Sequence, residues 1–412
     1  MSNILAELNV RSLGELHLQG KRVLLRADFN VPLDADGNVT DDTRITAALP
    51  TIHAIQKAGG RVIACSHLGR PKGKRVTALS LEPVATRLAE LLDQDVLLPD
   101  DCVGEAAQHL IGNQRDNQVV LLENLRFHGA ETDDNEDFAR RLSAHCDIFV
   151  NDAFGAMHRA HASVSAVARV MPDRAAGLLV AKELTFLTPL TGGAERPYIA
   201  ILGGAKIAGK IEVIERLLGC VDGLMIGGAM ANTFLAATGL PMGGSKVETD
   251  KVQLARHLIG RCTELEIPLW LPEDHVAARE ISPDADAEIV TAGALAHDQM
   301  AVDIGPKTIE RYTMILDGTS DGLDGAPKSI FWNGPMGIFE MENFAAGTMA
   351  LARAIARAPA VSVIGGGDSA SAVRKAGVQT MVSHVSTGGG ASLEFLAGNV
   401  LPGLAALRGG RR

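Results

Sequence analysis

Short apolar runs alternate with amphipathic stretches along the whole sequence, and this alternation constrains the fold more than any other feature. Strands are predicted in the first half at 22–26, 61–65, 119–122 and 148–150, and in the second half at 198–202, 223–226, 267–271, 329–332, 361–364 and 384–386. Helical spacing separates them, for example over 46–57, 81–92 and 135–144. Strands separated by helices form parallel β-α-β units. The sequence therefore predicts an α/β fold with doubly wound, Rossmann-like parallel sheets.

The length of the chain favours two such domains rather than one, because 412 residues exceed what a single core usually holds. The run 177–190 has helical periodicity and is broken by Thr191-Gly192-Gly193. We expect an N-terminal domain over 1–176, an interdomain hinge helix over 177–190 and a C-terminal domain over 191–393.

Composition excludes several classes of function. The formal net charge is −10, which argues against a general nucleic-acid binder or a membrane-surface protein. No apolar run reaches the roughly 18 residues of a membrane helix, and residues 1–11 lack a signal-peptide pattern. The five cysteines are widely spaced without a C-x-x-C pair, which favours reduced thiols over a disulfide framework or a zinc site. We expect a cytoplasmic protein.

Basic and amide side chains follow the predicted strands of the first half. Ligands of open parallel sheets bind at the carboxyl ends of the strands. The residues found there, or just beyond, are Asp28, Asn30, Arg44, His67, Arg70, Arg126 and Arg159. A solvated surface charge explains any one arginine, but the whole set predicts a site for a small, multiply charged anion.

A glycine turn with two lysines lies near the middle of the chain. Gly203 and Gly204 follow the predicted strand 198–202, and the spacing after them predicts a helix that carries Lys206 and Lys210 on one face. Glycines and a helix N-terminus favour a phosphate here. Residues 204–210 match the start of a P-loop, but Ile211 stands where a P-loop has Ser or Thr. A tight turn with two solvated lysines is the structural alternative.

Glycine clusters also follow the other strands of the second half. They are Gly227-Gly228, Gly334 within Asn333–Gly337, Gly365-Gly366-Gly367 and Gly388-Gly389-Gly390. Backbone that packs closely around one extended ligand, such as a nucleotide, needs glycine at those points. Tight turns throughout the domain are the alternative explanation.

These motifs together resemble those of the phosphoglycerate kinase family over essentially the whole chain. The resemblance in the first half rests on Leu25–Pro32, Ser66–Pro71, Glu123–His128, Asn151–Gly155 and His158–His161. In the second half it rests on Gly203–Lys206, Trp332–Glu340, Gly365–Ser369 and Ser386–Glu394. Small departures occur: Ala229 replaces a usual third glycine, Gly209 stands where Asp is common, and Ser369 replaces a frequent Thr.

The resemblance implies two sets of site residues. The N-terminal domain would bind 3-phosphoglycerate or 1,3-bisphosphoglycerate through Asp28, Phe29, Asn30, Arg44, His67, Leu68, Gly69, Arg70, Arg126 and Arg159. The C-terminal domain would bind ADP or ATP through Gly204, Ala205, Lys206, Lys210, Gly228, Asn333, Glu340, Gly366, Gly367, Asp368 and Ser369. Asp368 is the implied Mg²⁺ ligand, and Arg44, Lys206 and Gly367 are the implied catalytic residues. Segment 394–412 would return to the N-terminal domain.

The implied activity is reversible phosphoryl transfer between 1,3-bisphosphoglycerate and ADP, giving 3-phosphoglycerate and ATP, in glycolysis and gluconeogenesis. The attacking group in the reverse direction is a carboxylate, which is ionised at pH 7, so no general base is required. In-line positioning, charge stabilisation and hinge closure are expected to drive the reaction. We expect a monomer without nucleic-acid or membrane partners. A two-lobed anion-binding protein and a P-loop NTPase are the rival interpretations.

Overall fold

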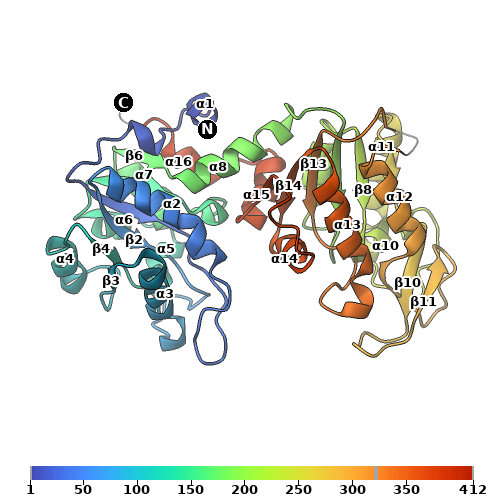
Figure 1. The fold of residues 1–412 in the computed structure, drawn as a ribbon, viewed down its shortest axis with the longest axis horizontal. Helices are drawn as coiled ribbons and strands as arrows, with labels where there is room; N and C mark the ends of the chain where they lie inside the picture. Colours follow the sequence, from blue (N-terminus) through green and yellow to red (C-terminus); the bar gives the residue numbers. More distant parts are fainter. Residues whose placement is uncertain (1, 320–322, 411–412) are drawn as a thin grey trace. The chain divides into compact units, whose positions relative to one another are not determined.

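The computed structural model describes residues 2–319 and 323–410, and the chain forms two compact units. Unit 1 comprises Met1–Thr185 and Val400–Arg412, and unit 2 comprises Phe186–Asn399. The division at Thr185 falls inside helix α8 (Leu178–Leu187), which lies within the predicted helical run. Each unit is built on its own parallel sheet (Figure 1).

Unit 1 contains a six-stranded sheet with the order β3-β4-β2-β1-β5-β6, and every pair in it is parallel. Its strands are β1 (Arg22–Arg26), β2 (Arg61–Cys65), β3 (Asp95–Leu97), β4 (Gln118–Leu121), β5 (Ile148–Asn151) and β6 (Arg174–Ala176). Strands β2, β4 and β3 lie on one side of β1, and strands β5 and β6 lie on its other side. Right-handed crossovers in opposite directions place helices on both faces and leave a switch point between β1 and β5.

Helices cover this sheet and bury its apolar side chains. They are α1 (Ser2–Glu7), α2 (Thr43–Lys57), α3 (Glu82–Leu92), α4 (Glu105–Gly112), α5 (Gly129–Thr132), α6 (Glu136–Ser143), α7 (Val167–Val170) and α16 (Pro402–Leu407). Leu25 and Val62 of the sheet pack with Ile52 of α2 and Leu88 of α3.

Helix α16 returns to unit 1 after the whole of unit 2. It packs against α7, β6 and the wide helical turn η5 (Ala162–Ala166) (Figure 1). The packing is close, since a Cβ on Gly403 would lie 2.7 Å from the Cγ1 atom of Val164.

Unit 2 contains a second parallel six-stranded sheet, with the order β15-β14-β13-β7-β8-β9. Its strands are β7 (Tyr198–Leu202), β8 (Gly223–Ile226), β9 (Leu269–Trp270), β13 (Ser329–Asn333), β14 (Val361–Gly365) and β15 (His384–Val385). In order of appearance this is the 3-2-1-4-5-6 arrangement of dinucleotide-binding sheets. The switch point lies between β7 and β13, so Gly203 and Gly334 emerge on either side of it.

Helices on this sheet close a core around Ile201, Trp332 and Ile355. They are α9 (Ile211–Leu217), α10 (Gly228–Ala237), α11 (Val252–Glu264), α12 (Pro306–Leu316), α13 (Ala346–Arg357), α14 (Gly367–Lys375) and α15 (Gly389–Leu396). Their presence between parallel strands confirms the predicted α/β class with two parallel sheets.

Unit 2 also contains a small antiparallel sheet that the sequence analysis does not predict. Its strands are β10 (Asp274–Ala278), β11 (Ala287–Thr291) and β12 (Met300–Ile304), in the order β11-β10-β12. It lies beside α10 and α12 (Figure 1). Exposure explains the omission of β11, because four of its five residues are exposed and no apolar run marks it.

In the described part of the chain, no helix combines the length and apolar character required to span a bilayer.

Candidate functional site

The carboxyl end of β1 supplies the first predicted site residues of unit 1. The Asp28 side chain is nearly buried and forms an ion pair with Arg44 of α2. The Asn30 Oδ1 atom accepts a hydrogen bond from the backbone N–H of Gly69, 2.9 Å away. Phe29 and Leu68 are buried in the core below this edge, so their side chains support the site rather than line it.

His67 lies at the end of β2 beneath a cluster of arginines. Its Nδ1 atom lies 3.0 Å from Nη2 of the buried Arg26. Because a guanidinium only donates, Nδ1 must accept, which places the ring proton on Nε2. Burial, followed by the charges of Arg26, Arg126, Arg159 and Arg44, holds the pKa of His67 well below its usual value. His67 is therefore a neutral hydrogen-bond donor through Nε2.

Arg126 is the most constrained of the predicted arginines. Its Nη1 atom donates to the carbonyl oxygen of Gly69 at 2.8 Å, and its buried Nε has no partner among the described residues. Burial and then the charges of Arg159 and Arg26 lower the pKa of Arg126 to about 10. Like charges held this close favour a bound anion. Arg159 contacts His158, with 3.0 Å between Nε and Nε2, and Arg70 is exposed.

A buried carboxylate that the sequence analysis missed supports these arginines. Glu131 is fully buried and accepts from the Ser163 backbone N–H at 2.9 Å and the Ser163 hydroxyl at 2.7 Å. The Ser163 hydroxyl oxygen in turn accepts from Arg26 Nε at 2.8 Å. Arg26 lies in an apolar strand run, so the sequence gives no sign that its charge faces the site edge. The chain from Glu131 to His67 fixes the orientation of the imidazole.

Unit 2 has a cavity of about 300 Å³ at the carboxyl edge of its parallel sheet. Predicted residues on its wall are Gly204, Ala205, Gly228, Glu340 and Asp368. The opposite wall includes Met300, Val302 and Asp303 of the antiparallel sheet, which explains why the sequence did not identify them. Such a partly apolar cavity with a few polar groups suits a small organic ligand.

The glycines around this cavity have two different physical causes. A Cβ on Gly228 would lie 2.5 Å from the Gly204 nitrogen, and one on Gly334 would lie 2.3 Å from the Gly203 oxygen. Gly228 and Gly334 are therefore required because any side chain there would clash with the neighbouring backbone. In contrast, a Cβ on Gly367 would meet no atom within 4 Å. The structural alternative therefore accounts for part of the glycine pattern.

Lys206 and Lys210 do not share a helical face, so that part of the prediction is wrong. Helix α9 begins only at Ile211, and both lysines belong to the irregular turn before it. Lys206 is exposed. The Lys210 ammonium is buried and donates to the carbonyl oxygens of Gly203 and Asn333, the latter at 3.0 Å. Burial lowers the pKa of Lys210 to about 8, against the opposing charge of Asp368.

Asp368 and Ser369 lie in the first turn of helix α14, and Asp368 lines the same cavity. The Asp368 carboxylate is exposed, in the first turn of the helix. The Ser369 hydroxyl oxygen accepts from the Gly334 backbone N–H at 2.6 Å, so this hydroxyl joins the ends of two strands. Asn333 is buried, with its side-chain amide next to Gly366. One exposed carboxylate near phosphate-sized space matches how proteins bind Mg²⁺, through one or two carboxylates and the phosphates themselves.

Comparisons with known proteins point to one family. A family model described as phosphoglycerate kinase matches residues 13–399. A phosphoglycerate kinase of Anaeromyxobacter dehalogenans (strain 2CP-C) is 51% identical over 400 residues, which cover 96% of this chain and 99% of that protein. One from Chlorobium phaeobacteroides (strain BS1) is 52% identical over 401 residues, with the same coverage.

Solved structures agree with these relatives. The structure of phosphoglycerate kinase from Coxiella burnetii matches with a TM-score of 0.85 and 39% identity, over 97% of this chain and 98% of that one. The enzyme from Pyrococcus horikoshii OT3 matches with a TM-score of 0.83 and 34% identity, over 96% and 98%.

Proposed function

We propose, because this chain belongs to the phosphoglycerate kinase family, that it transfers a phosphoryl group reversibly between 1,3-bisphosphoglycerate and ADP, giving 3-phosphoglycerate and ATP in glycolysis and gluconeogenesis. The observation that carries the proposal is a pair of sites at the carboxyl edges of two parallel sheets. Unit 1 offers the arginine cluster around His67, and unit 2 offers the glycine-edged cavity. Two such sites suit one multiply charged anion and one nucleotide.

We assign the phosphoglycerate to the edge of unit 1. Its contacts are Asp28, Asn30, Arg44, His67, Arg70, Arg126 and Arg159, with Phe29, Leu68 and Gly69 shaping the edge. Arginines recognise phosphate and carboxylate through paired N–H groups. The Nε2–H of His67 is a donor that the substrate can use, and the buried Nε of Arg126 has no partner among the described residues.

We assign ADP or ATP to the cavity of unit 2. Its contacts are Gly204, Ala205, Lys206, Lys210, Gly228, Asn333, Glu340, Gly366, Gly367, Asp368 and Ser369. Mg²⁺ would be held by Asp368 together with the phosphates, and it would neutralise part of their charge. The Lys210 ammonium donates hydrogen bonds to two carbonyl oxygens in this structure. A contact with a phosphate therefore requires Lys210 to give up one of these hydrogen bonds.

The chemistry needs positioning rather than proton transfer. The attacking oxygen belongs to a carboxylate that is ionised at pH 7. Neutral His67 is a poor general base with so low a pKa, but it can orient the substrate as a donor. Arg44, Lys206 and the backbone of Gly367 are our candidates for stabilising charge on the transferring phosphoryl group.

Transfer also requires that both ligands meet and that water is excluded. We propose that hinge closure accomplishes this, with segment 177–190 and the return near Glu394 as the hinges. We further propose that the protein is a monomer and acts in the cytoplasm. Size-exclusion chromatography with light scattering tests the oligomeric state, and cell fractionation tests the location.

A coupled assay tests the activity. Purified protein receives 3-phosphoglycerate, MgATP, glyceraldehyde-3-phosphate dehydrogenase and NADH, and NADH loss is followed. We expect loss only when both substrates are present. Release of phosphate from ATP without 3-phosphoglycerate, measured in parallel, would instead support an NTPase, and binding of both ligands without turnover would support a binding protein.

A further inference from the structure

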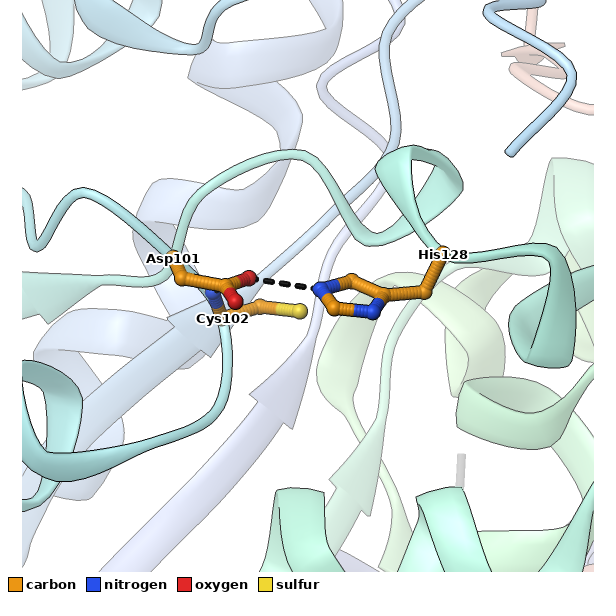
Figure 2. A group of neighbouring side chains, drawn as sticks. All are labelled: Asp101, Cys102 and His128. Atoms are coloured by element: carbon orange, nitrogen blue, oxygen red, sulfur yellow. Dashed lines mark hydrogen bonds and ion pairs between the residues drawn. The ribbon is translucent and has the colours of Figure 1, made fainter. Parts of the chain in front are cut away.

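Three potential metal ligands converge on the surface of unit 1 outside the proposed substrate site. Asp101 and Cys102 lie in the loop between β3 and α4, and His128 follows the short helix η3 (Leu125–Phe127). Figure 2 shows the thiol, the carboxylate and the imidazole turned towards one another. Among the described residues, this is the one group of at least three such side chains close enough to share an ion.

The geometry of the group is compact and held from both sides. The Nε2 atom of His128 lies 2.6 Å from Oδ1 of Asp101, and all three ligand atoms lie within 4.8 Å of one another. The Cys102 backbone N–H donates to the same Oδ1 atom at 2.7 Å, which holds the carboxylate over the thiol. The Phe138 ring packs against the imidazole, with 5.2 Å between the ring centroids.

We propose that Asp101, Cys102 and His128 form a binding site for one Zn²⁺-like divalent cation. A carboxylate and a thiolate together carry two negative charges, which balance the charge of the ion. Three protein ligands with a water in the fourth position give the tetrahedral geometry that zinc adopts. Solvent reaches two of the three ligands, because the side chains of Asp101 and His128 are 41% and 28% exposed, whereas Cys102 is buried.

The donor set selects the type of metal. Thiolate and imidazole suit zinc and cobalt, whereas Mg²⁺ demands oxygen ligands in octahedral geometry. In the complex His128 coordinates the ion through Nε2. The Cys102 thiol coordinates as a thiolate and loses its proton to solvent.

The proposed metal site lies next to the segment that carries Arg126. His128 is two residues from Arg126, and its segment also packs on the loop of Gly73, where a Cβ would lie 3.1 Å from Gly129. An ion would join the loop before α4 to the segment that carries Arg126. The spacing in sequence hides the site, because His128 lies 26 residues after Cys102 and no C-x-x-C pair occurs.

Cobalt titration of the whole protein tests the proposal. Chelator-treated protein without nucleotide is titrated with Co²⁺ while the thiolate-to-cobalt charge-transfer band in the near ultraviolet is recorded. We expect one equivalent per chain to produce the band, Zn²⁺ to abolish it and excess Mg²⁺ to leave it unchanged. Cys102→Ser should remove the band, and His128→Gln and Asp101→Asn should each weaken Co²⁺ binding by at least about tenfold.

Matched controls separate this site from other thiols and from misfolding. Cys220→Ser changes a half-buried cysteine of unit 2 and should leave the titration as in the parent protein. Circular dichroism verifies the fold of each variant, and if Cys102→Ser does not fold, His128→Gln decides, since its side chain is partly exposed. Absence of the band in the parent protein, or its persistence in Cys102→Ser or at full strength in His128→Gln, would overturn the proposal.

Discussion

The guanidinium of Arg44 and the carboxylate of Asp28 form an ion pair, with 2.9 Å between Nη1 and Oδ2. Asp28 is held at the end of β1 with only 9% of its side chain exposed, whereas 37% of the Arg44 side chain is exposed. The pair therefore consists of a fixed anion and a cation that is partly free to contact a ligand. Asp28 aims Arg44 without using all five of its donors.

Replacing Arg44 should slow transfer without affecting the nucleotide site. An arginine that stabilises a transferring phosphoryl group is worth about 10³ to 10⁵ in rate. We expect the kcat of Arg44→Ala to be lower than that of the parent protein by a factor within that range. The affinity for ATP, measured by calorimetry, should be unchanged. Arg141→Ala is the matched control, since it removes an exposed arginine of α6 outside the proposed site and should leave kcat unchanged. A fall of kcat below tenfold for Arg44→Ala would contradict its catalytic role.

The tautomer of His67 predicts different effects for two isosteric replacements. The amide nitrogen of Gln can occupy the position of Nε2, whereas that of Asn occupies the position of Nδ1. A lost neutral hydrogen bond costs about 0.5–1.5 kcal/mol. We expect His67→Asn to raise KM for 3-phosphoglycerate by up to about tenfold, and His67→Gln to raise it clearly less. Equal KM values for the two variants would show that the Nε2 donor is not used.

Asp368 should act on nucleotide binding through the metal. Its carboxylate is exposed at the start of α14, where it repels phosphate unless a cation lies between them. We expect Asp368→Asn to weaken MgATP binding strongly and metal-free ATP binding little or not at all, as measured by calorimetry. Equal losses with and without Mg²⁺ would indicate a structural role instead.

Lys206 and Lys210 should give different kinetic defects. Exposed Lys206 can contact the transferring group, and an interaction made only in the transition state changes kcat. Half-buried Lys210 joins the ends of β7 and β13, so Lys210→Ala should raise KM for ATP and also lower Tm. Lys206→Ala should reduce mainly kcat at an unchanged Tm. The same kcat, KM and Tm pattern in both variants would refute this division.

Asp303 should make the stability of unit 2 depend on pH. Burial raises its pKa to about 7, against hydrogen bonds from the backbone N–H groups of Gly347 and Ile304. Between its unfolded pKa near 4 and pH 7 the folded protein binds the extra proton, so this contribution to stability falls as pH rises. We expect Asp303→Asn to raise Tm relative to the parent more at about pH 8 than at about pH 5. Asp250→Asn, at an exposed position, should show no such difference.

The pattern of strands and helices made both parallel sheets predictable from sequence. Apolar runs such as 22–26 and 198–202 appear at the predicted bounds, because strands buried on both faces leave continuous hydrophobic signals. In the small sheet, β11 lacked that signal because four of its five residues are exposed. Strands β3 and β6 lack a clear apolar signal, because β3 begins with the exposed Asp95 and the apolar residues of β6 are two alanines.

The residues of the candidate site could be predicted from the sequence only in part, for a different physical reason. Charged residues that follow predicted strands, such as Arg44 and Arg126, stand out in the sequence. Arg26 and Glu131 do not, because a buried charge is identified only by the partners that surround it in three dimensions. The helical spacing assigned to Lys206 and Lys210 failed because the turn before Ile211 is wider than a two-glycine connection.

Helix α16 has a consequence for the order in which a ribosome delivers this protein. All six strands of the unit 1 sheet emerge before unit 2 is translated, yet α16, which covers η5 and α7, follows the whole of unit 2. Val164 and Met157, which pack under Gly403, remain uncovered while the more than two hundred residues of unit 2 are synthesised. A nascent chain stalled within unit 2 therefore displays an apolar patch on an otherwise assembled sheet domain. Chaperones and proteases can recognise such a patch until α16 covers it.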